Sequence, residues 1–271
     1  MTQLRTPLEV YKILPGTNCG RCFLPSCLAF SAAVIRGDRK LTDCPPLRKS
    51  GTVAQVTAIH GEQREKELQE QIGLLQARIS QLDLGEAAAR IGGELCHGRL
   101  RLQVLGKIYD VDPVGHVTSV CHTHPGLVIP LLNYILDGRD VRPCGRWVAF
   151  RDLKDGPSMN PLFVQRGEIP LRQLADSQPE FFADLVSVFS GHRAEADLSD
   201  TAGADADISV VLYPLPRLPV MICYWQPEDD LESKLHILFD ACADDQLGIR
   251  AIYSLTVGLV MMFEKIARGH T

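Results

Sequence analysis

The sequence lacks the signatures of several protein classes. No run of 18 or more apolar residues occurs in its 271 residues, which excludes a transmembrane helix. The start, MTQLRTPLEVYKILPG, has no apolar stretch of the kind a secretory signal peptide contains. Internal repeats and low-complexity tracts are also missing. We therefore predict a globular, cytoplasmic protein that keeps its thiols reduced.

Familiar catalytic motifs are absent as well. The chain has no G-x-S-x-G, Walker loop, G-x-G-x-x-G or H-E-x-x-H, and no C-x3-C-x2-C signature of radical enzymes that use S-adenosylmethionine. The net charge of -5 argues against a general affinity for nucleic acid. Whether the protein is an enzyme therefore stays open at the level of sequence.

Charge and cysteine are unevenly distributed along the chain. The first 50 residues hold eight Lys and Arg against three Asp and Glu, whereas the other 221 hold 20 against 30. Four of the nine cysteines lie between Cys19 and Cys44. An odd number of cysteines in a reducing compartment is a poor basis for a disulfide framework, so metal ligation is the better interpretation of the dense group.

The four N-terminal cysteines have the spacing C-x2-C-x4-C-x16-C, formed by Cys19, Cys22, Cys27 and Cys44. Three closely spaced thiolates suit three corners of an iron–sulfur cube, and a distant fourth thiolate can close the last corner. The text LAFSAAVIRG between the third and fourth cysteines predicts a helix that returns the chain to the cluster. We predict one 4Fe-4S cluster on these four ligands.

Zinc is the main alternative metal. Structural zinc sites favour two C-x2-4-C pairs, but here the last two cysteines are separated by sixteen residues that include a predicted helix. The spacing therefore favours the 4Fe-4S cluster over zinc and over unligated thiols. A cluster with four cysteine ligands has no open iron, so it would move electrons rather than bind substrate.

The texts LPGTNCG, PSCLAF and DCPPL resemble the small 4Fe-4S module of the corrinoid iron–sulfur protein large subunit (acetyl-CoA decarbonylase/synthase gamma subunit). The same module occurs in the B subunit of Rnf electron-transport complexes. The resemblance implies that Cys19, Cys22, Cys27 and Cys44 bind the cluster in low-potential anaerobic metabolism. Phe23 departs from the family, which usually has glycine there. No D-x-H-x-x-G cobalamin motif occurs, so bound B12 is not implied.

The remainder of the chain resembles a different family, of uncharacterised proteins from anaerobic bacteria and archaea. The texts that carry this resemblance are WVAFRDLKDGP, QRGEIPL, LYPLPRLPVMICYW and HILFDACADDQL. That family implies no activity for this part of the chain.

We predict three regions: a 4Fe-4S module at 1–50, a helical connector at 51–84, and an α+β body at 85–271. The connector carries apolar residues at heptad spacing, here called the apolar seam: Leu68, Ile72, Leu75, Ile79 and Leu82. Only about two heptads are covered, so two interpretations stand. The helix lays its seam on the body, or residues 61–84 pair as a coiled coil and make a homodimer.

The body is predicted to be a mixed α/β structure with an antiparallel sheet. Strand and helix runs do not alternate regularly, so α+β fits better than a doubly wound fold. We predict a solvated acidic loop at residues 193–207, and two strands around a turn in ISVVLYPLPRLPVMICYWQP. Residues 236–268 are predicted to form two helices with a break near Gly248.

A second metal site is a weaker candidate. Cys121, His122 and His124 lie within four positions, and Cys96 with His97 offers further ligands. No supporting carboxylate or thiolate lies near them in sequence, so a loop before a helix is the preferred interpretation.

Other polar and sulfur-bearing residues are interpreted structurally. We expect Cys223 and Cys242, which stand in apolar text, to be buried and inert. Cys144 is flanked by two arginines, Arg142 and Arg146, that could activate it, but a structural role is preferred. His236 is expected to cap a helix or fill the core. Two interpretations fit Arg151, Asp152 and Asp155 equally well: they form a polar turn at the end of a strand, or they line a pocket.

The leading functional hypothesis is a one-electron carrier whose body docks a partner or holds a further cofactor. Its basic module would favour an acidic redox partner such as a ferredoxin, and the resemblance suggests a corrinoid or other metalloprotein as acceptor. The alternative is a redox-sensing or ligand-binding protein in which the cluster is structural or regulatory. A third class is an enzyme whose body takes electrons from the cluster.

Overall fold

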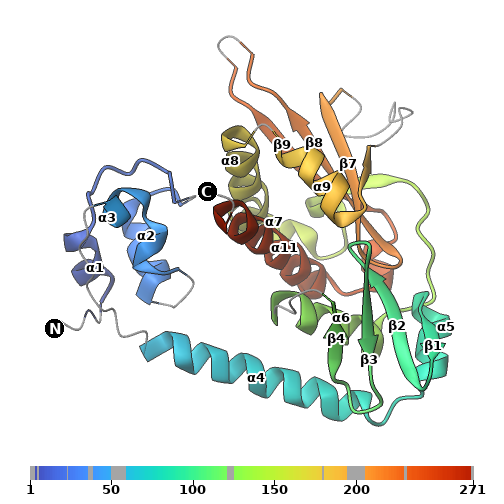
Figure 1. The fold of residues 1–271 in the computed structure, drawn as a ribbon. Coiled ribbons are helices and arrows are strands. Elements are labelled where there is room, and N and C mark those ends of the chain that lie inside the picture. Colours follow the sequence, from blue (N-terminus) through green and yellow to red (C-terminus); the bar gives the residue numbers. More distant parts are fainter. Residues whose placement is uncertain are drawn as a thin grey trace. The chain divides into compact units, whose positions relative to one another are not determined.

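The structure is a computed structural model, and it describes residues 4, 6–22, 24–35, 39–49, 59–120, 125–178, 180–193, 205–228 and 231–269. The chain divides into two compact units, residues 1–71 and residues 72–271 (Figure 1). The division into three regions at residues 1–50, 51–84 and 85–271 remains a prediction.

Unit 1 is built from short helices around a small apolar core. Its helices are α1 (Pro7–Ile13), α2 (Cys27–Ile35), the 3-10 turn η1 (Leu41–Asp43), α3 (Pro45–Lys49) and the first part of α4 (Ile59–Ile79). Helix α1 begins at a capping box, in which the N–H of Glu9 donates to Thr6 Oγ1 and the N–H of Thr6 donates to Glu9 Oε2. The core of the unit joins α1, α2 and α3, and its buried residues are Leu4, Val10, Leu14, Cys27, Phe30, Val34, Cys44 and Leu47.

Helix α4 continues from unit 1 into unit 2, and its side chains are described from Lys66 onward. In its last turns Leu75 and Ile79 are buried, whereas Leu74, directly before Leu75, is 71% exposed. Gln76 donates a hydrogen bond of 3.3 Å to the carbonyl of Gly115, which lies in unit 2. The end of the apolar seam therefore packs on the body. Pairing of two copies through residues 61–84 stays a prediction.

The first sheet of unit 2 is an antiparallel meander in the order β1-β2-β3-β4. Its strands follow helix α5 (Leu84–Ile91) and are β1 (Glu94–Cys96), β2 (Arg99–Val104), β3 (Lys107–Val111) and β4 (Val117–Ser119). Two-residue turns with positive φ, His97–Gly98 and Leu105–Gly106, close the first two hairpins. Alternate residues of β2 are buried, so the sheet presents one apolar face to the core.

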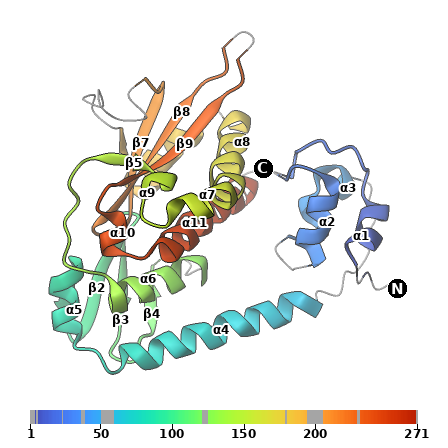
Figure 2. The same cartoon turned by 180° about the vertical axis from the view of Figure 1, so that it is seen from behind.

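The second sheet is also antiparallel, in the order β5-β9-β8-β7-β6. Figure 2 labels its strands β5, β7, β8 and β9. Its strands are β5 (Trp147–Ala149), β6 (His192–Arg193), β7 (Ile208–Leu215), β8 (Leu218–Trp225) and β9 (Lys234–Asp240). One face packs against α8 and α11 through Leu212, Ile222 and Ile237. Residues that alternate with these, such as Met221 and Leu238, form a second apolar cluster on the other face. The central strands are therefore buried on both faces.

Helices complete unit 2. They are α6 (Pro125–Asp137), the 3-10 turn η2 (Phe150–Asp152), α7 (Gly156–Phe163), the π-helical turn η3 (Val164–Glu168), α8 (Ile169–Ser177), α9 (Phe181–Phe189), α10 (Ala243–Gln246) and α11 (Ile249–Gly269). Phe150 and Phe163 stack with ring centroids 4.1 Å apart, which ties η2 to α7. None of the helices in the described residues combines the length and the apolarity that a membrane span requires.

The observed elements confirm the predicted α+β class with antiparallel sheets. The predicted helix at the start of residues 236–268 is wrong, because Lys234–Asp240 forms strand β9. A strand buried on both faces shows a continuous apolar run, and periodicity alone does not separate such a run from a helix. Most of the predicted acidic loop, residues 194–204, lies outside the described residues.

Candidate metal centre

The loop before α2 positions the first cysteines. Gly16, Asn18 and Gly20 take left-handed backbone conformations with φ of 69°, 49° and 68°, which turn the chain sharply on either side of Cys19. The Oδ1 atom of Asn18 accepts a 2.8 Å hydrogen bond from the N–H of Cys27. This bond ties the start of the loop to the first residue of α2.

The first turn of α2 holds the third cysteine. Ser26 precedes the helix and its Oγ accepts the N–H of Ala29 at 3.1 Å, as an N-cap does. Cys27 is the first helical residue and is 8% exposed. Its carbonyl accepts a 2.8 Å hydrogen bond from the hydroxyl of Ser31. The thiol of Cys27 is therefore attached to a rigid helix end.

The fourth cysteine follows the turn η1. Asp43 Oδ2 accepts the N–H of Lys40 at 2.9 Å, and the N–H of Cys44 donates to the carbonyl of Leu41. Pro45 then starts α3 directly after Cys44, which suits the first position of a helix because proline has no N–H. Cys44 is 6% exposed and packs in the core of the unit.

All four predicted ligands come together. Cys19, Cys22, Cys27 and Cys44 line one open cavity. Cys19 is exposed, Cys22 is half-buried, and the other two are buried, so the cavity runs from the core to the surface. Most of the other side chains that line the cavity are apolar, namely Leu14, Pro15, Leu24, Phe30, Pro45 and Pro46.

The electrostatics show that the thiols influence one another. The backbone N–H of Arg21 lowers the pKa of Cys19. Burial raises the pKa of Cys22, and the nearby Cys44 and Cys19 add to the rise. Burial also raises the pKa of Cys44, again with Cys27 and Cys19 contributing. A bound cation would relieve this crowding by accepting the thiolates as ligands.

The spacing of the sulfur atoms bears on the kind of metal. A single tetrahedral zinc with Zn–S bonds near 2.3 Å holds its sulfurs about 3.8 Å apart. Among the described residues, only a group in the body has three potential ligand atoms within 4.8 Å of one another. The four N-terminal cysteines do not form such a group. Four cysteine thiols are a donor set that fits an iron–sulfur cluster.

Several other candidates from the sequence take structural places. Arg151 and Asp152 belong to η2, where Asp152 Oδ2 accepts the N–H of Ala149 at 3.2 Å, and Asp155 precedes α7 with a φ of 63°. These exposed residues form a polar turn. Cys121, His122 and His124 lie outside the described residues.

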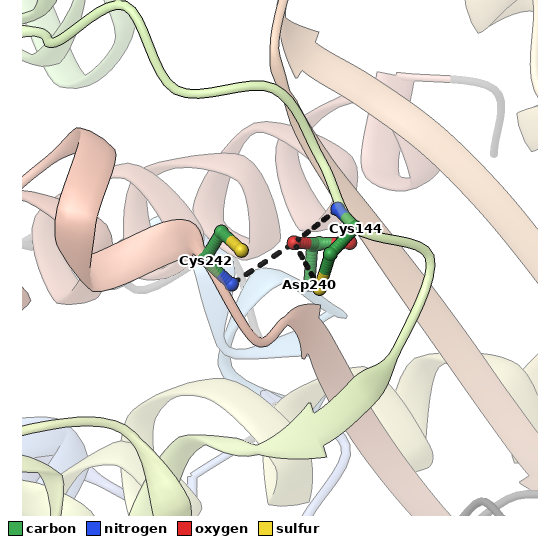
Figure 3. A group of neighbouring side chains, drawn as sticks. All are labelled: Cys144, Asp240 and Cys242. Carbon is green, nitrogen blue, oxygen red and sulfur yellow. Dashed lines mark hydrogen bonds between the residues drawn. The ribbon is translucent and has the colours of Figure 1, made fainter.

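The structure tests the places that the sequence predicts for one histidine and two cysteines of the body. His236 lies on strand β9 rather than on a helix, with its Nδ1 3.3 Å from Glu168 Oε1. Cys223 is fully buried, as expected. Cys242 is only half-buried and stands beside Cys144 and Asp240 (Figure 3). The sequence could not show this group, because 98 positions separate its cysteines and strand register alone brings them together.

The body contains an open cavity of about 420 Å³ between the first sheet and helices α9 and α11. Apolar side chains dominate its lining, with two lysines, Lys107 and Lys265, among them. It is lined by no acidic residue, cysteine or histidine among the residues that the structure describes, so its chemistry suits binding more than catalysis.

The N-terminal region is similar to proteins that carry iron–sulfur clusters. Residues 14–46 match a family described as "Putative Fe-S cluster". The acetyl-CoA decarbonylase/synthase complex subunit gamma 2 of Methanosarcina mazei is 43% identical over 94 residues, which are 34% of this chain and 18% of that protein. The corrinoid/iron-sulfur protein large subunit of Moorella thermoacetica is 50% identical over 40 residues, 15% of this chain and 9% of that protein.

These matches are partial. The corresponding gamma subunit of Archaeoglobus fulgidus is 35% identical over 116 residues, 40% of this chain and 23% of that protein. The chain thus spans less than a quarter of the length of each of these relatives. No solved structure matches it.

The body has its own family. Residues 83–262, more than half of the chain, match the model described as "Domain of unknown function (DUF3786)". That range covers both antiparallel sheets and most of the helix α11 that packs on the second one. The chain therefore belongs to the DUF3786 family and carries an N-terminal iron–sulfur cluster region in front of the family domain.

Proposed function

We propose that this protein binds one 4Fe-4S cluster on Cys19, Cys22, Cys27 and Cys44 and uses it for low-potential one-electron transfer in anaerobic metabolism. The observation that carries the proposal is the convergence of these four cysteines on one cavity. Four cysteine ligands satisfy all four irons of such a cluster, so the cluster passes electrons and leaves no iron for a substrate.

The surrounding backbone supports a bound cluster. The N–H groups of Arg21, Leu24 and Leu47 hydrogen-bond to the sulfurs of Cys19, Cys22 and Cys44, respectively. Such N–H donors stabilise negative charge on ligand sulfurs and tune the reduction potential of the cluster. The apolar wall of the cavity limits water on the buried side, while the exposed Cys19 gives electrons a short path to the surface.

The charge of the module supports an acidic redox partner. Its first 50 residues hold eight basic against three acidic side chains, which would attract a ferredoxin or a similar acidic donor. The named relatives are subunits of the acetyl-CoA decarbonylase/synthase complex and a corrinoid protein. We therefore include a corrinoid or other metalloprotein as the electron acceptor, and a cytoplasmic location, in the proposal. The resemblance of the module to that of Rnf electron-transport complexes points to the same kind of electron carrier.

The first test is composition and redox behaviour of the full chain purified without oxygen. We expect about four irons and four sulfides per chain, as four-cysteine ligation requires. The reduced protein should give the electron paramagnetic resonance signal of a one-electron-reduced cluster, and the couple should cycle reversibly near the roughly −400 mV typical of low-potential ferredoxins. Stoichiometric zinc without sulfide would overturn the proposal.

A ligand variant and a matched control sharpen the test. Cys44→Ser should lose most of the iron and sulfide, because one corner of the cluster loses its thiolate. Cys96→Ser changes a half-buried cysteine of the body and should retain both. Equal iron in the two variants would show that Cys44 is not a ligand.

The body cavity favours a second candidate function, in which the body binds a ligand and the cluster acts as a structural or redox-sensing element. Its mostly apolar lining with two lysines suits an apolar molecule with an anionic group. Mass spectrometry of molecules that co-purify with the full chain tests this candidate. A cluster that dissolves in air and changes the oligomeric state, without reversible cycling, would favour sensing over electron transfer.

A further inference from the structure

A second group of metal-ligating side chains lies in the body, far along the chain from the N-terminal cysteines. The sulfur atoms of Cys144 and Cys242 and a carboxylate oxygen of Asp240 all lie within 4.8 Å of one another (Figure 3). Asp240 is the last residue of β9, and Cys242 follows two positions later. Cys144 precedes β5 by three positions.

Strand register produces this meeting. Strands β5 and β9 are antiparallel, with Trp147 opposite Asp240. The residues before β5 therefore lie beside the residues after β9, and the N–H of Ala241 donates to the carbonyl of Arg146 at 2.8 Å. The two thiols reach the carboxylate from two separate segments of backbone, as Figure 3 shows.

Asp240 is 2% exposed, and hydrogen bonds hold its carboxylate in a fixed orientation. Its Oδ1 accepts the N–H groups of Cys144 at 3.1 Å and of Cys242 at 2.9 Å, and its Oδ2 accepts the N–H of Gly145 at 2.7 Å. Hydrogen bonds of this kind orient the carboxylate ligands of metal sites. Since a carboxylate oxygen can accept from more than one partner, Oδ2 can bind a cation beside the N–H of Gly145.

Within the described part of the chain no Lys, Arg or His forms an ion pair with Asp240. The thiol of Cys144 donates to Asp240 Oδ1 at 3.4 Å.

We propose that Cys144, Cys242 and Asp240 form a second metal site that binds one thiophilic divalent cation of the zinc type. Two thiolates and one carboxylate are three protein ligands that zinc accepts in a tetrahedral site, and water supplies the fourth. Cys144 is exposed, so both the ion and the water have access. Binding replaces the two thiol protons, which pass to solvent, and involves no change of oxidation state.

The experiment uses the full chain purified without oxygen, with its cluster intact. The protein is equilibrated with zinc chloride, freed of unbound ion by gel filtration, and analysed for zinc and iron together. We expect about one zinc per chain with unchanged iron. Cys144→Ser and Cys242→Ser should each weaken zinc binding at least tenfold, and Cys96→Ser should leave it unchanged.

A protection experiment needs no variant. Thiols of the wild-type chain are alkylated with and without zinc, and each cysteine is followed by mass spectrometry. Zinc should slow the labelling of Cys144 and Cys242 at least tenfold and leave Cys96 unaffected. Equal labelling in both conditions, or zinc retained in both serine variants with iron unchanged, would overturn the site. A disulfide between Cys144 and Cys242 in the oxygen-free protein would also overturn it and assign the pair to thiol oxidation.

Discussion

At the scale of single residues, Asn18 has two roles in the cysteine loop. Its backbone takes a φ of 49°, and its side chain accepts the N–H of Cys27. Asparagine tolerates this left-handed conformation better than most residues because its short polar side chain can bond locally. The loop before Cys19 and the helix start at Cys27 are thereby linked through one side chain.

We predict that Asn18→Ala accelerates loss of the cluster. The variant loses a hydrogen bond worth about 1 kcal/mol and adds backbone strain of about 1 kcal/mol. The matched variant Asn18→Gly loses the same hydrogen bond but accepts the positive φ, so its effect should be about half as large in free energy. The decay of cluster absorbance under a chelator measures both. Identical decay in wild type and Asn18→Ala would contradict the role.

At the scale of elements, the end of α4 belongs to the packing of the body. Ile79 is fully buried, and Leu75 is 7% exposed. A Cβ atom added to Gly115 would lie only 2.9 Å from the Cα of Gln76. The turn before β4 therefore approaches the helix closely. The apolar seam is therefore used in part within one chain.

We predict that Ile79→Ala lowers the free energy of unfolding of the body by about 2–5 kcal/mol, the usual cost of such a core truncation. Leu74→Ala, on the exposed side of the same helix, should change it by less than about 0.5 kcal/mol. Chemical denaturation of the full chain measures both variants. Equal stability of the two would mean that α4 leaves the body in solution.

The hairpin of β2 and β3 carries a cross-strand ion pair. Arg101 and Asp110 are direct partners in the register, and two hydrogen bonds of 2.8 and 3.1 Å join them. The hydrogen bond from Arg101 lowers the pKa of Asp110. A lowered pKa in the folded state adds stability above the unfolded pKa and loses it as the pH falls through the folded one.

We therefore predict that Asp110→Asn lowers the melting temperature modestly at pH 7 and that the difference from wild type shrinks below about pH 4, the usual pKa of an unfolded aspartate. Asp137→Asn is the control for an exposed ion pair, because Asp137 faces Arg78 with both side chains 54% exposed. Thermal unfolding across this pH range measures the two. A difference that grows toward acid would contradict the assigned direction.

At the scale of the whole molecule, the division of the chain decides which fragment folds. The sequence predicts a body that begins at residue 85, whereas contacts place Ile72 and the residues after it with the body. A fragment of 72–271 keeps Leu75 and Ile79, and a fragment of 85–271 exposes the surfaces that they cover. Cluster ligands are absent from both.

We predict that the fragment 72–271 is colourless, compact and about as stable as the body in the full chain. The fragment 85–271 should unfold at a lower denaturant concentration because it loses two buried apolar side chains, each worth about 1.5–3 kcal/mol. Size-exclusion chromatography and denaturation compare them. Aggregation of both fragments would mean that the module and the body share one core.

The sequence by itself determined the grouping of the N-terminal cysteines, because Cys19, Cys22 and Cys27 are close in the chain and their spacing limits the geometry that they can form. It also indicated the α+β class, since alternating strands and apolar helix runs are local patterns. The β7–β8 hairpin follows from the same local logic. For these features the physical constraint acts over a few residues.

Only the tertiary structure decided the rest. Residues 234–240 are a strand because they lie between β5 and β8 in the sheet, and their buried run did not reveal this. Leu75 and Ile79 of the seam are buried because this end of α4 packs on the body, where Gln76 donates to the carbonyl of Gly115. Cys144, Asp240 and Cys242 meet because antiparallel register joins segments 98 residues apart, and no local pattern encodes register between distant strands.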